Sequence, residues 1–252
     1  MSTGISVLLA TRGRTDILKR SLLSLTDRAS NVSNLEILLA FDDDDTKTFK
    51  WVEKNVLPEL DKRGAVYSCM SFERLGYIRL NEYYNALSAA ATGQWLFFWG
   101  DDAIMETQDW DNVILKETRF RVLRALAHNA HPIAVFPIVP KAWYDMFGYF
   151  SPHQLNDNWV SQVAYMTDIM ENIPVEVTHD RFDLTGNNND ETYKNRPMLE
   201  GNPADPRDFH HPTWIRRRMN DCEKIANHLK TQGEDTTWWE NVKRGKIGRA
   251  HV

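Results

Sequence analysis

Cysteine is scarce in this chain, and its scarcity excludes several classes of protein. Only Cys69 and Cys222 carry thiols among 252 residues, which rules out a disulfide framework and a cysteine-based zinc site. Apolar runs of the roughly 18–20 residues that span a membrane are missing, and so is an N-terminal cationic segment followed by a long apolar stretch. The chain also lacks a glycine-rich dinucleotide fingerprint and a Walker loop. We therefore expect a cytoplasmic protein with reduced thiols and no transmembrane segment.

Charge is distributed unevenly along the chain. Residues 1–204 hold 28 acidic and 20 basic side chains, whereas residues 205–252 hold 7 acidic and 10 basic ones. With its excess of negative charge, the part of the chain at 1–204 is not expected to bind nucleic acid through overall charge. The basic C-terminal part could still contact phosphate groups locally.

Short apolar runs alternate with helical periodicity over the first 140 residues. Buried strands are predicted at 5–10, 35–41, 65–70, 94–99 and 133–139. Helices are predicted at 17–25, 46–63 (with a break at Pro58 and Gly64 as its cap), 79–91 (with Gly93 as a candidate cap after its end) and 109–127. This alternation predicts an α/β fold of three layers, Rossmann-like, with a mainly parallel central sheet.

The second half of the chain is less regular. Its expected elements are a helix at 159–171, a strand at 174–178, a long mobile loop at 185–206 and helices at 212–232 and 237–244. We expect a loop-rich, helical C-terminal part that belongs to the same compact domain.

Polar residues follow three of the predicted strands. Open α/β sheets bind ligands at the carboxyl ends of their strands, where this chain has residues 11–14, 42–45 and 100–102. The adjacent carboxylates of Asp101 and Asp102 repel each other, and burial adds to that cost. Mn²⁺ or Mg²⁺ offsets both effects. The alternative is an acidic turn or the N-cap of the following helix.

Three blocks of sequence, in this order, resemble glycosyltransferases of the GT-A fold and family-2-like type, which include viral members. The blocks are residues 5–14, 38–45 and 76–102. The resemblance implies a metal-dependent transferase that uses a nucleotide-diphosphate sugar, UDP-sugar above all, and that works in the host cytoplasm if the protein is viral. It also implies that residues 1–140 bind the nucleotide sugar, that 141–206 form the acceptor side, and that 207–252 are a basic helical extension.

The resemblance assigns donor contacts to polar residues at the strand ends and just after them. These residues are Thr11, Arg12, Arg14, Asp42, Asp44, Arg79 and Asp101. Arginine can form forked hydrogen bonds with diphosphate or base oxygens, and the alternative for Arg12 and Arg14 is an ordinary surface position. Asp42 and Asp44 face the same way if the strand continues.

The resemblance also implies metal ligands and a general base. Asp102 is expected to bind the metal, although the family's usual Asp-x-Asp motif has lost one acidic position here. His179, at the end of a short strand, is expected to complete the metal site, with His210 and His211 as the next candidates. Asp157, at a helix start, is the expected base in an inverting enzyme. The alternatives are a structural histidine and a helix cap.

The acceptor stays open between a glycan and a nucleic acid. Residues 216–218 and 243–249 are basic and lie near Trp214, Trp238 and Trp239, and some viral glycosyltransferases modify hydroxymethylated bases in DNA. Basic side chains could contact the backbone while an aromatic ring stacks on an extruded base. The favoured alternative is a solvated basic helix packed by its tryptophans. Rival functions are a sugar-nucleotidyltransferase and a non-catalytic binding module for nucleotide sugar or nucleic acid.

Overall fold

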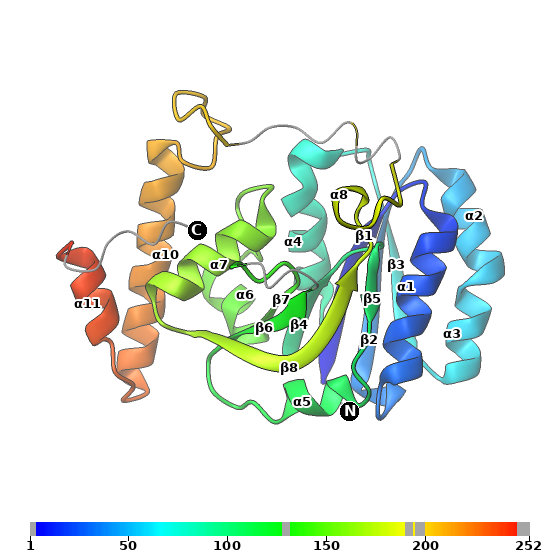
Figure 1. Ribbon diagram of the computed structural model, residues 1–252, viewed down its shortest axis with the longest axis horizontal. Coiled ribbons are helices and arrows are strands. Elements are labelled where there is room, and N and C mark those ends of the chain that lie inside the picture. The colour runs from blue at the N-terminus through cyan, green and yellow to red at the C-terminus, as the bar shows by residue number, and fades with distance from the viewer. Residues whose placement is uncertain (1–3, 128–131, 190–193, 195–199, 246–252) are drawn as a thin grey trace.

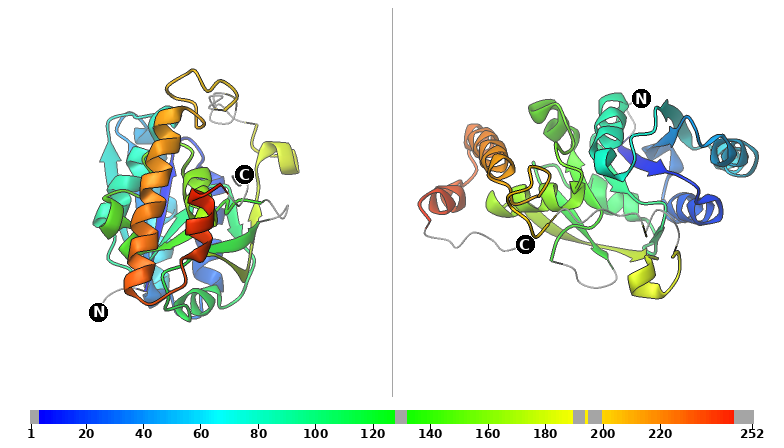
Figure 2. Two further views of the ribbon diagram at one scale, coloured as in Figure 1. Left: turned by 90° about the vertical axis from the view of Figure 1, so that its left-hand side faces the viewer. Right: turned by 90° about the horizontal axis from the view of Figure 1, so that it is seen from above.

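A single mixed sheet runs through the molecule with helices on both of its faces (Figures 1 and 2). The computed structural model describes residues 4–127, 132–189, 194 and 200–245. The strands are β1 (Ile5–Thr11), β2 (Leu35–Asp42), β3 (Val66–Phe72), β4 (Trp95–Trp99), β5 (Ala103–Met105), β6 (Val122–Ala127), β7 (Pro137–Pro140) and β8 (Met170–His179). Their order in the sheet is β3-β2-β1-β4-β7-β6-β8-β5. The sheet is mostly parallel, which confirms the predicted fold class.

Two groups of helices cover the two faces of the sheet. The helices are α1 (Thr15–Arg28), α2 (Thr46–Asn55), α3 (Leu57–Arg63), α4 (Leu80–Ala90), α5 (Trp110–Leu115), α6 (Lys141–Phe147), α7 (Asn156–Met166), α8 (Phe182–Thr185), α10 (Pro212–Thr231) and α11 (Thr237–Lys243). Side chains of α1, α2, α3 and α5 form one apolar core with the sheet, and those of α4, α6, α7 and α10 form a second core on the other face. The three-layer arrangement is therefore confirmed.

The two cores explain why the first strand is apolar at nearly every position. Ile5, Val7 and Leu9 are fully buried in the core under α1, while Leu8 is fully buried in the core under α4. A parallel strand covered on both faces needs apolar side chains in both directions. Burying each large apolar side chain contributes about 1.5–3 kcal/mol, so this strand anchors the sheet.

The predicted break at Pro58 is confirmed. The helical segment divides into α2 and α3 at Val56, and Pro58 lies in the first turn of α3, where its missing N–H costs nothing. Gly64 ends α3 with a φ of 69°, the left-handed conformation expected of a helix cap.

The predicted helix at 109–127 is wrong. Helix α5 ends at Leu115, and the side chain of Glu117 then accepts hydrogen bonds from the backbone N–H groups of Thr118 and Arg119, at 2.9 and 2.8 Å. Residues 122–127 form β6 instead, paired with β7 and β8. The helical spacing of the apolar residues was overridden by strand pairing, a tertiary interaction that local periodicity does not report.

Other boundaries also differ from the prediction. The strand expected at 133–139 is β7 at 137–140, and it runs antiparallel to β4. Helix α7 covers 156–166 rather than 159–171, because β8 begins at Met170 and takes the end of the predicted helix. Gly93 is not the left-handed cap of α4. A Cβ at this position would lie 2.6 Å from the backbone nitrogen of Ser6, so glycine permits the close approach of two chain segments.

The C-terminal helices pack against α7 as part of the second core. Trp239 is only 2% exposed, and the indole N–H groups of Trp214 and Trp238 donate to the carbonyl oxygens of Pro206 and Tyr165. The tryptophans near the basic residues thus serve packing in the described structure. The predicted basic run continues through residues 246–249, which lie outside the described residues. No helix within the described ranges combines the length and apolar character needed to cross a membrane.

A buried histidine supports the turn before α7. His153 is fully buried, accepts a hydrogen bond at Nδ1 from the Leu155 N–H at 3.1 Å, and has Nε2 3.0 Å from the carbonyl oxygen of Arg207. These partners suit a neutral ring that carries its proton on Nε2. Burial lowers the pKa of His153 to about 4.

We expect this histidine to make folding stability depend on pH. Because the pKa of His153 is lower in the folded protein than in the unfolded chain, its contribution is complete above about pH 6.5 and is lost as the pH falls toward 4. The lost stability is up to about 3 kcal/mol. Urea unfolding of wild type and His153→Gln between pH 7.5 and 4.5 measures it, and the difference between the two proteins should shrink at acidic pH. Parallel stability curves would contradict the assignment.

Candidate functional site

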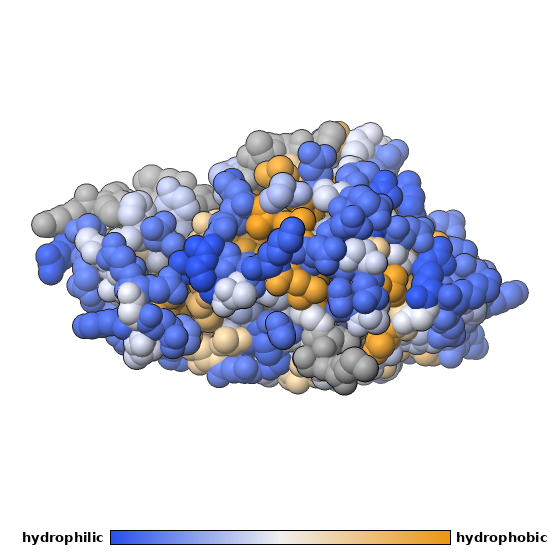
Figure 3. Space-filling model, turned by 90° about the horizontal axis from the view of Figure 1, so that it is seen from below, coloured by the Kyte–Doolittle hydropathy of each residue, from blue (hydrophilic) through white to orange (hydrophobic). Residues whose placement is uncertain are grey.

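The chain ends of three strands meet at one edge of the sheet. Thr11 ends β1, Asp101 and Asp102 follow β4 after Gly100, and His179 ends β8. Pairing of β5 with β8 places Ala103 opposite His179, and the N–H of Asp180 donates to the carbonyl oxygen of Asp102 at 2.8 Å. This edge is the upper one in Figure 1. The opposite edge, seen in Figure 3, is largely hydrophilic with apolar side chains exposed near its middle.

Asp101 is held by the loop that follows β1. Its Oδ2 accepts a hydrogen bond from the Thr11 hydroxyl at 2.8 Å, and its Oδ1 accepts one from Nη1 of Arg14 at 2.8 Å. The side chain of Asp101 is 9% exposed. Burial raises the pKa of Asp101 to about 6, the charge of Arg14 opposes that rise, and the charge of Asp102 adds to it. The predicted residues Thr11, Arg14, Asp101 and Asp102 thus form one contact group.

Asp102 lies between Arg14 and His179. Its Oδ2 is 3.1 Å from Nη1 of Arg14, and its Oδ1 is 3.3 Å from Nε2 of His179. Burial acts to raise the pKa of Asp102, but the hydrogen bond and charge of His179 and the charge of Arg14 together lower it. The ring of Phe136 packs edge-on against His179, with 5.0 Å between centroids.

The donor set of Asp102 and His179 fits a divalent cation. Two neighbouring ligands at 2.0–2.1 Å in an octahedron are about 3 Å apart, close to the 3.3 Å between Oδ1 of Asp102 and Nε2 of His179. The described residues contain no group of three or more histidine, cysteine or acidic side chains suited to a metal. Mg²⁺ and Mn²⁺ commonly take one or two protein ligands and complete their shell with phosphate oxygens and water.

A second polar cluster lies at the end of β2. Arg12 contacts Asp42 at 2.9 Å and makes a two-pronged contact with Asp44. The hydroxyl of Tyr83 donates to the other oxygen of Asp42, whose side chain is 5% exposed. Arg12 and Asp44 are 34% and 45% exposed, so they form the accessible part of the cluster. The hydrogen bond from Arg12 lowers the pKa of Asp44.

Helix α4 connects the parts of the site through three consecutive residues that our sequence reasoning did not assign. Tyr83 contacts Asp42, and the hydroxyl of Tyr84 donates to the carbonyl oxygen of Trp99 at 3.0 Å. The side-chain amide of Asn85 donates to the carbonyl oxygen of Ser151 at 2.9 Å and accepts from the N–H of Phe150 at 2.8 Å. Asn85 belongs to one of the blocks that carry the family resemblance, which was the available signal.

The segment that Asn85 holds leads into α7 and Asp157. Helix α7 begins at Asn156, so Asp157 lies in its first turn, as expected, and its Oδ1 accepts a hydrogen bond from the N–H of Asn158 at 2.9 Å. The side chain of Asn158 donates to Glu200 at 3.0 Å, which joins this helix start to the chain beyond residue 199. Residues 190–193 and 195–199 of the predicted mobile loop lie outside the described residues.

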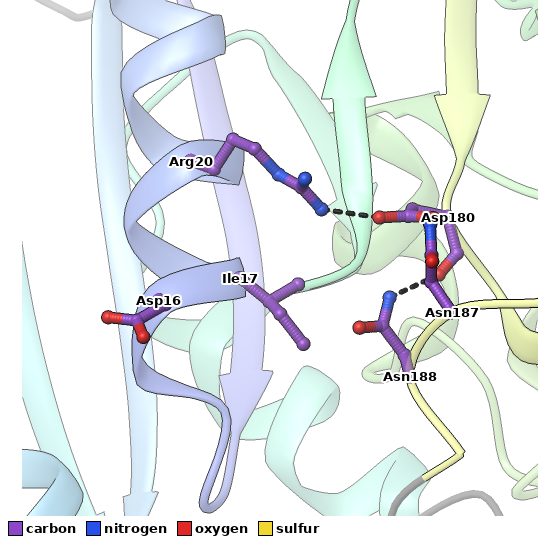
Figure 4. Close-up of a pocket in the computed structure, with 6 residues that line it drawn as sticks. All are labelled: Asp16, Ile17, Arg20, Asp180, Asn187 and Asn188. Atoms are coloured by element: carbon purple, nitrogen blue, oxygen red, sulfur yellow. Dashed lines mark hydrogen bonds and ion pairs between the residues drawn. The ribbon is translucent and has the colours of Figure 1, made fainter.

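The residue after His179 ties the metal-ligand candidates to α1. Asp180 forms an ion pair with Arg20 and accepts hydrogen bonds from Thr185 at 2.7 Å and Asn187 at 2.9 Å. Figure 4 shows the open pocket between α1 and this segment. Its lining residues are Asp16, Ile17, Arg20, Asp180, Asn187 and Asn188. Together with the hydrogen bond from its N–H to the Asp102 carbonyl, these contacts hold Asp180 in place directly after His179.

Three other candidates make local contacts. Arg79 is exposed and forks onto Glu82 with two bonds of 2.6 Å. The ring of His211 accepts a hydrogen bond from the N–H of Thr213 and caps α10, and the ring of His210 packs against Phe209. A role for these residues in donor or metal binding stays a prediction.

Solved structures with a similar fold are glycosyltransferases. The mannosyltransferase PcManGT from Pyrobaculum calidifontis, in complex with GDP-Man and Mn²⁺, has a TM-score of 0.54 at 13% identity over 96% of this chain and 79% of its own. Residues 1–349 of S. aureus TarS, in complex with UDP, have a TM-score of 0.55 at 14% identity over 96% of this chain and 91% of their own. The complex of TarS with UDP-GlcNAc gives 0.54 and 13%.

No family model matches the sequence, and neither does any curated protein. At 13–14% identity, structural likeness establishes the fold and leaves the activity to the site's own chemistry. The match covers 96% of this chain. The chain therefore has the fold of GT-A-type glycosyltransferases.

Proposed function

We propose that this protein is a metal-dependent glycosyltransferase that moves a sugar from a nucleoside-diphosphate donor to a hydroxyl acceptor. The observation that carries the proposal is the contact group at the carboxyl end of β4. There, Asp102 lies 3.3 Å from His179 and shares Arg14 with Asp101. Buried carboxylates beside an imidazole and a guanidinium suit a metal-bound diphosphate.

The donor would lie across the ends of β1, β2 and β4. Asp102 and His179 would hold the metal, which stabilises the negative charge that develops on the leaving diphosphate. Arg12 and Asp44, the accessible members of the β2 cluster, would contact the base or ribose. Mn²⁺ with GDP-Man in the mannosyltransferase, and UDP or UDP-GlcNAc in TarS, are consistent with such a donor. Within this class we propose a UDP-sugar.

The acceptor would approach from the side of α7. Asp157 would take the proton of the acceptor hydroxyl while that oxygen forms a bond to the anomeric carbon and the bond from this carbon to the diphosphate breaks. Asp157 lies in the first turn of α7, where the partial positive charge of a helix start favours the carboxylate form that a general base needs. The proton stays on Asp157, and the electron pair of the broken bond leaves with the diphosphate.

The acceptor is either a glycan or a nucleic acid, and the basic C-terminal extension bears on which of the two is favoured. Lys243 is paired with Glu223 and Glu240, and Arg218 is buried against Phe209, so only part of the basic extension is presented to a polyanion. We therefore rank a glycan acceptor above hydroxymethylated DNA. Radiolabelled sugar transferred to DNA containing hydroxymethylated bases, and not to oligosaccharides, would reverse the ranking.

A panel of nucleotide sugars tests the donor side without knowledge of the acceptor. With Mn²⁺, the correct donor should raise the melting temperature and be hydrolysed slowly, while donors with the wrong base should do neither. A sugar-nucleotidyltransferase would instead release pyrophosphate from a nucleoside triphosphate and a sugar phosphate. Failure of every donor to stabilise the protein with Mn²⁺ would overturn the proposed function.

We expect His179→Ala to weaken Mn²⁺ binding by about 10-fold and to lower turnover more strongly. The imidazole is one ligand among several, so its loss leaves Asp102 and the diphosphate oxygens on the metal. Calorimetric titration of Mn²⁺ with the donor present measures the first effect, and donor hydrolysis at saturating Mn²⁺ measures the second. His228→Ala, which removes a ring on α10 that packs against Phe120, is the matched control. Unchanged turnover at saturating metal would make His179 a structural residue.

A further inference from the structure

One guanidinium lies between the two carboxylates of the acidic pair. Nη1 of Arg14 is 2.8 Å from Oδ1 of Asp101 and 3.1 Å from Oδ2 of Asp102. The side chains of Arg14, Asp101 and Asp102 are 10%, 9% and 11% exposed, so water screens these contacts poorly. On the far side of the same carboxylate, Oδ1 of Asp102 faces His179.

This geometry gives the site a cation of its own before any metal binds. Arginine stays protonated at all pH values at which proteins are folded, so Arg14 offsets one of the two negative charges. Thr11 also holds Asp101, and the two contacts together keep the pair in place without a metal. A metal on Oδ1 of Asp102 would share that carboxylate with Arg14 on Oδ2, and two cations close together in a poorly screened site repel each other.

We propose that Arg14 is the resident counter-cation of the acidic pair and that it makes metal binding depend on the nucleoside diphosphate. The inference rests on the proposed function. The diphosphate carries negative charge that attracts both the metal and Arg14. The repulsion between these two cations is therefore offset only when the diphosphate is bound. Because linked binding equilibria are reciprocal, the metal raises the affinity for the diphosphate by the same factor.

Binding of Mn²⁺, followed by the electron paramagnetic resonance signal of the free ion, tests this coupling. Wild type should bind Mn²⁺ at least about 100-fold more tightly with saturating UDP than without it. Arg14→Gln should bind Mn²⁺ alone about 10-fold more tightly than wild type and gain less than about 10-fold from UDP. If the panel of nucleotide sugars identifies a donor with another base, the nucleoside diphosphate with that base replaces UDP in the measurements on both proteins.

Two further variants separate the charge of Arg14 from its shape and from the overall charge of the chain. Arg14→Lys keeps a cation near the pair and should keep most of the coupling. Arg28→Gln removes a cation from α1, but one that contacts Glu106, so the affinity for Mn²⁺ alone should stay at the wild-type value. Circular dichroism in the absence of metal checks each fold. If Arg14→Gln does not fold, Arg14→Met, with an apolar stem of similar length, takes its place.

The outcomes distinguish the inference from the function on which it rests. If the Arg14 variant binds Mn²⁺ alone no more tightly than wild type, Arg14 only positions the carboxylates and the inference is overturned. UDP-dependent Mn²⁺ binding by wild type would then leave the proposed function standing. If wild type binds Mn²⁺ neither alone nor with any nucleoside diphosphate, both the inference and the proposed metal dependence fail.

Discussion

Replacement of Asp157 by asparagine is expected to slow sugar transfer by roughly 10²–10⁴-fold while donor affinity stays unchanged. This is the usual contribution of general base catalysis, and an amide of the same shape cannot take the acceptor proton. Asp157 lies in the first turn of α7, in the part of the chain that we propose to bind the acceptor. Transfer rate against pH for both proteins, with donor affinity measured separately, checks the prediction.

A second carboxylate on the same half provides the control. Asp145 lies on α6 and pairs with Lys141 on the surface, so Asp145→Asn removes the same charge without touching α7 and should transfer sugar at the wild-type rate. If Asp157→Asn loses stability instead of rate, Asp157 is only a helix cap. Near-normal transfer by the folded variant would mean that another group is the base, or that the enzyme retains configuration and needs none.

The other large effect is expected for Asp102→Asn, which should abolish Mn²⁺-dependent nucleotide binding and leave the fold intact. Residues that hydrogen-bond to the ligands of a metal typically contribute 10–100-fold to metal affinity. Loss of a direct anionic ligand should therefore weaken Mn²⁺ binding at least about 100-fold. The amide keeps the size of the side chain but removes the charge that faces His179. Calorimetry with Mn²⁺ and UDP, compared with thermal unfolding without either, measures both parts of the prediction.

Asp109→Asn serves as the control for charge. Asp109 is exposed and adopts a φ of 57°, a left-handed conformation that asparagine tolerates well. The change lowers the negative charge of the chain by the same amount and should leave Mn²⁺ binding as in wild type. Equal Mn²⁺-dependent affinity in Asp102→Asn and wild type would show that the metal assignment is wrong.

Our sequence-based errors share a cause. Residues 122–127 have apolar side chains at positions compatible with both a helix and a strand, and only the neighbours β7 and β8 select the strand. Gly93 was assigned a helix-capping role because glycine often ends helices, whereas its lack of a Cβ serves the approach to Ser6. In each case the deciding contact joins residues far apart in the chain, which no local window includes.

The role of Arg14 is a further example of a property that the sequence leaves open. As a residue in the loop after β1, it could meet a diphosphate directly or pair with a carboxylate. The fold brings it against Asp101 and Asp102, 87 and 88 residues away. Asp42 behaves similarly, since Arg12 and Tyr83 occupy both of its oxygens and leave Asp44 as the more accessible acid.

The sequence by itself determined the apolar strands β1, β2 and β4, the helices α1, α4 and α10, and the strand ends at which polar residues gather. Those features depend on local hydrophobic period and on the rule that parallel strands end at one edge. Only the tertiary structure decided that Asp102 lies within 3.3 Å of His179, that one arginine joins both carboxylates, and that Asn85 holds the segment before Asp157. Such contacts depend on strand order and on helix packing across the sheet, which arise from the burial of the whole chain rather than from any segment of it.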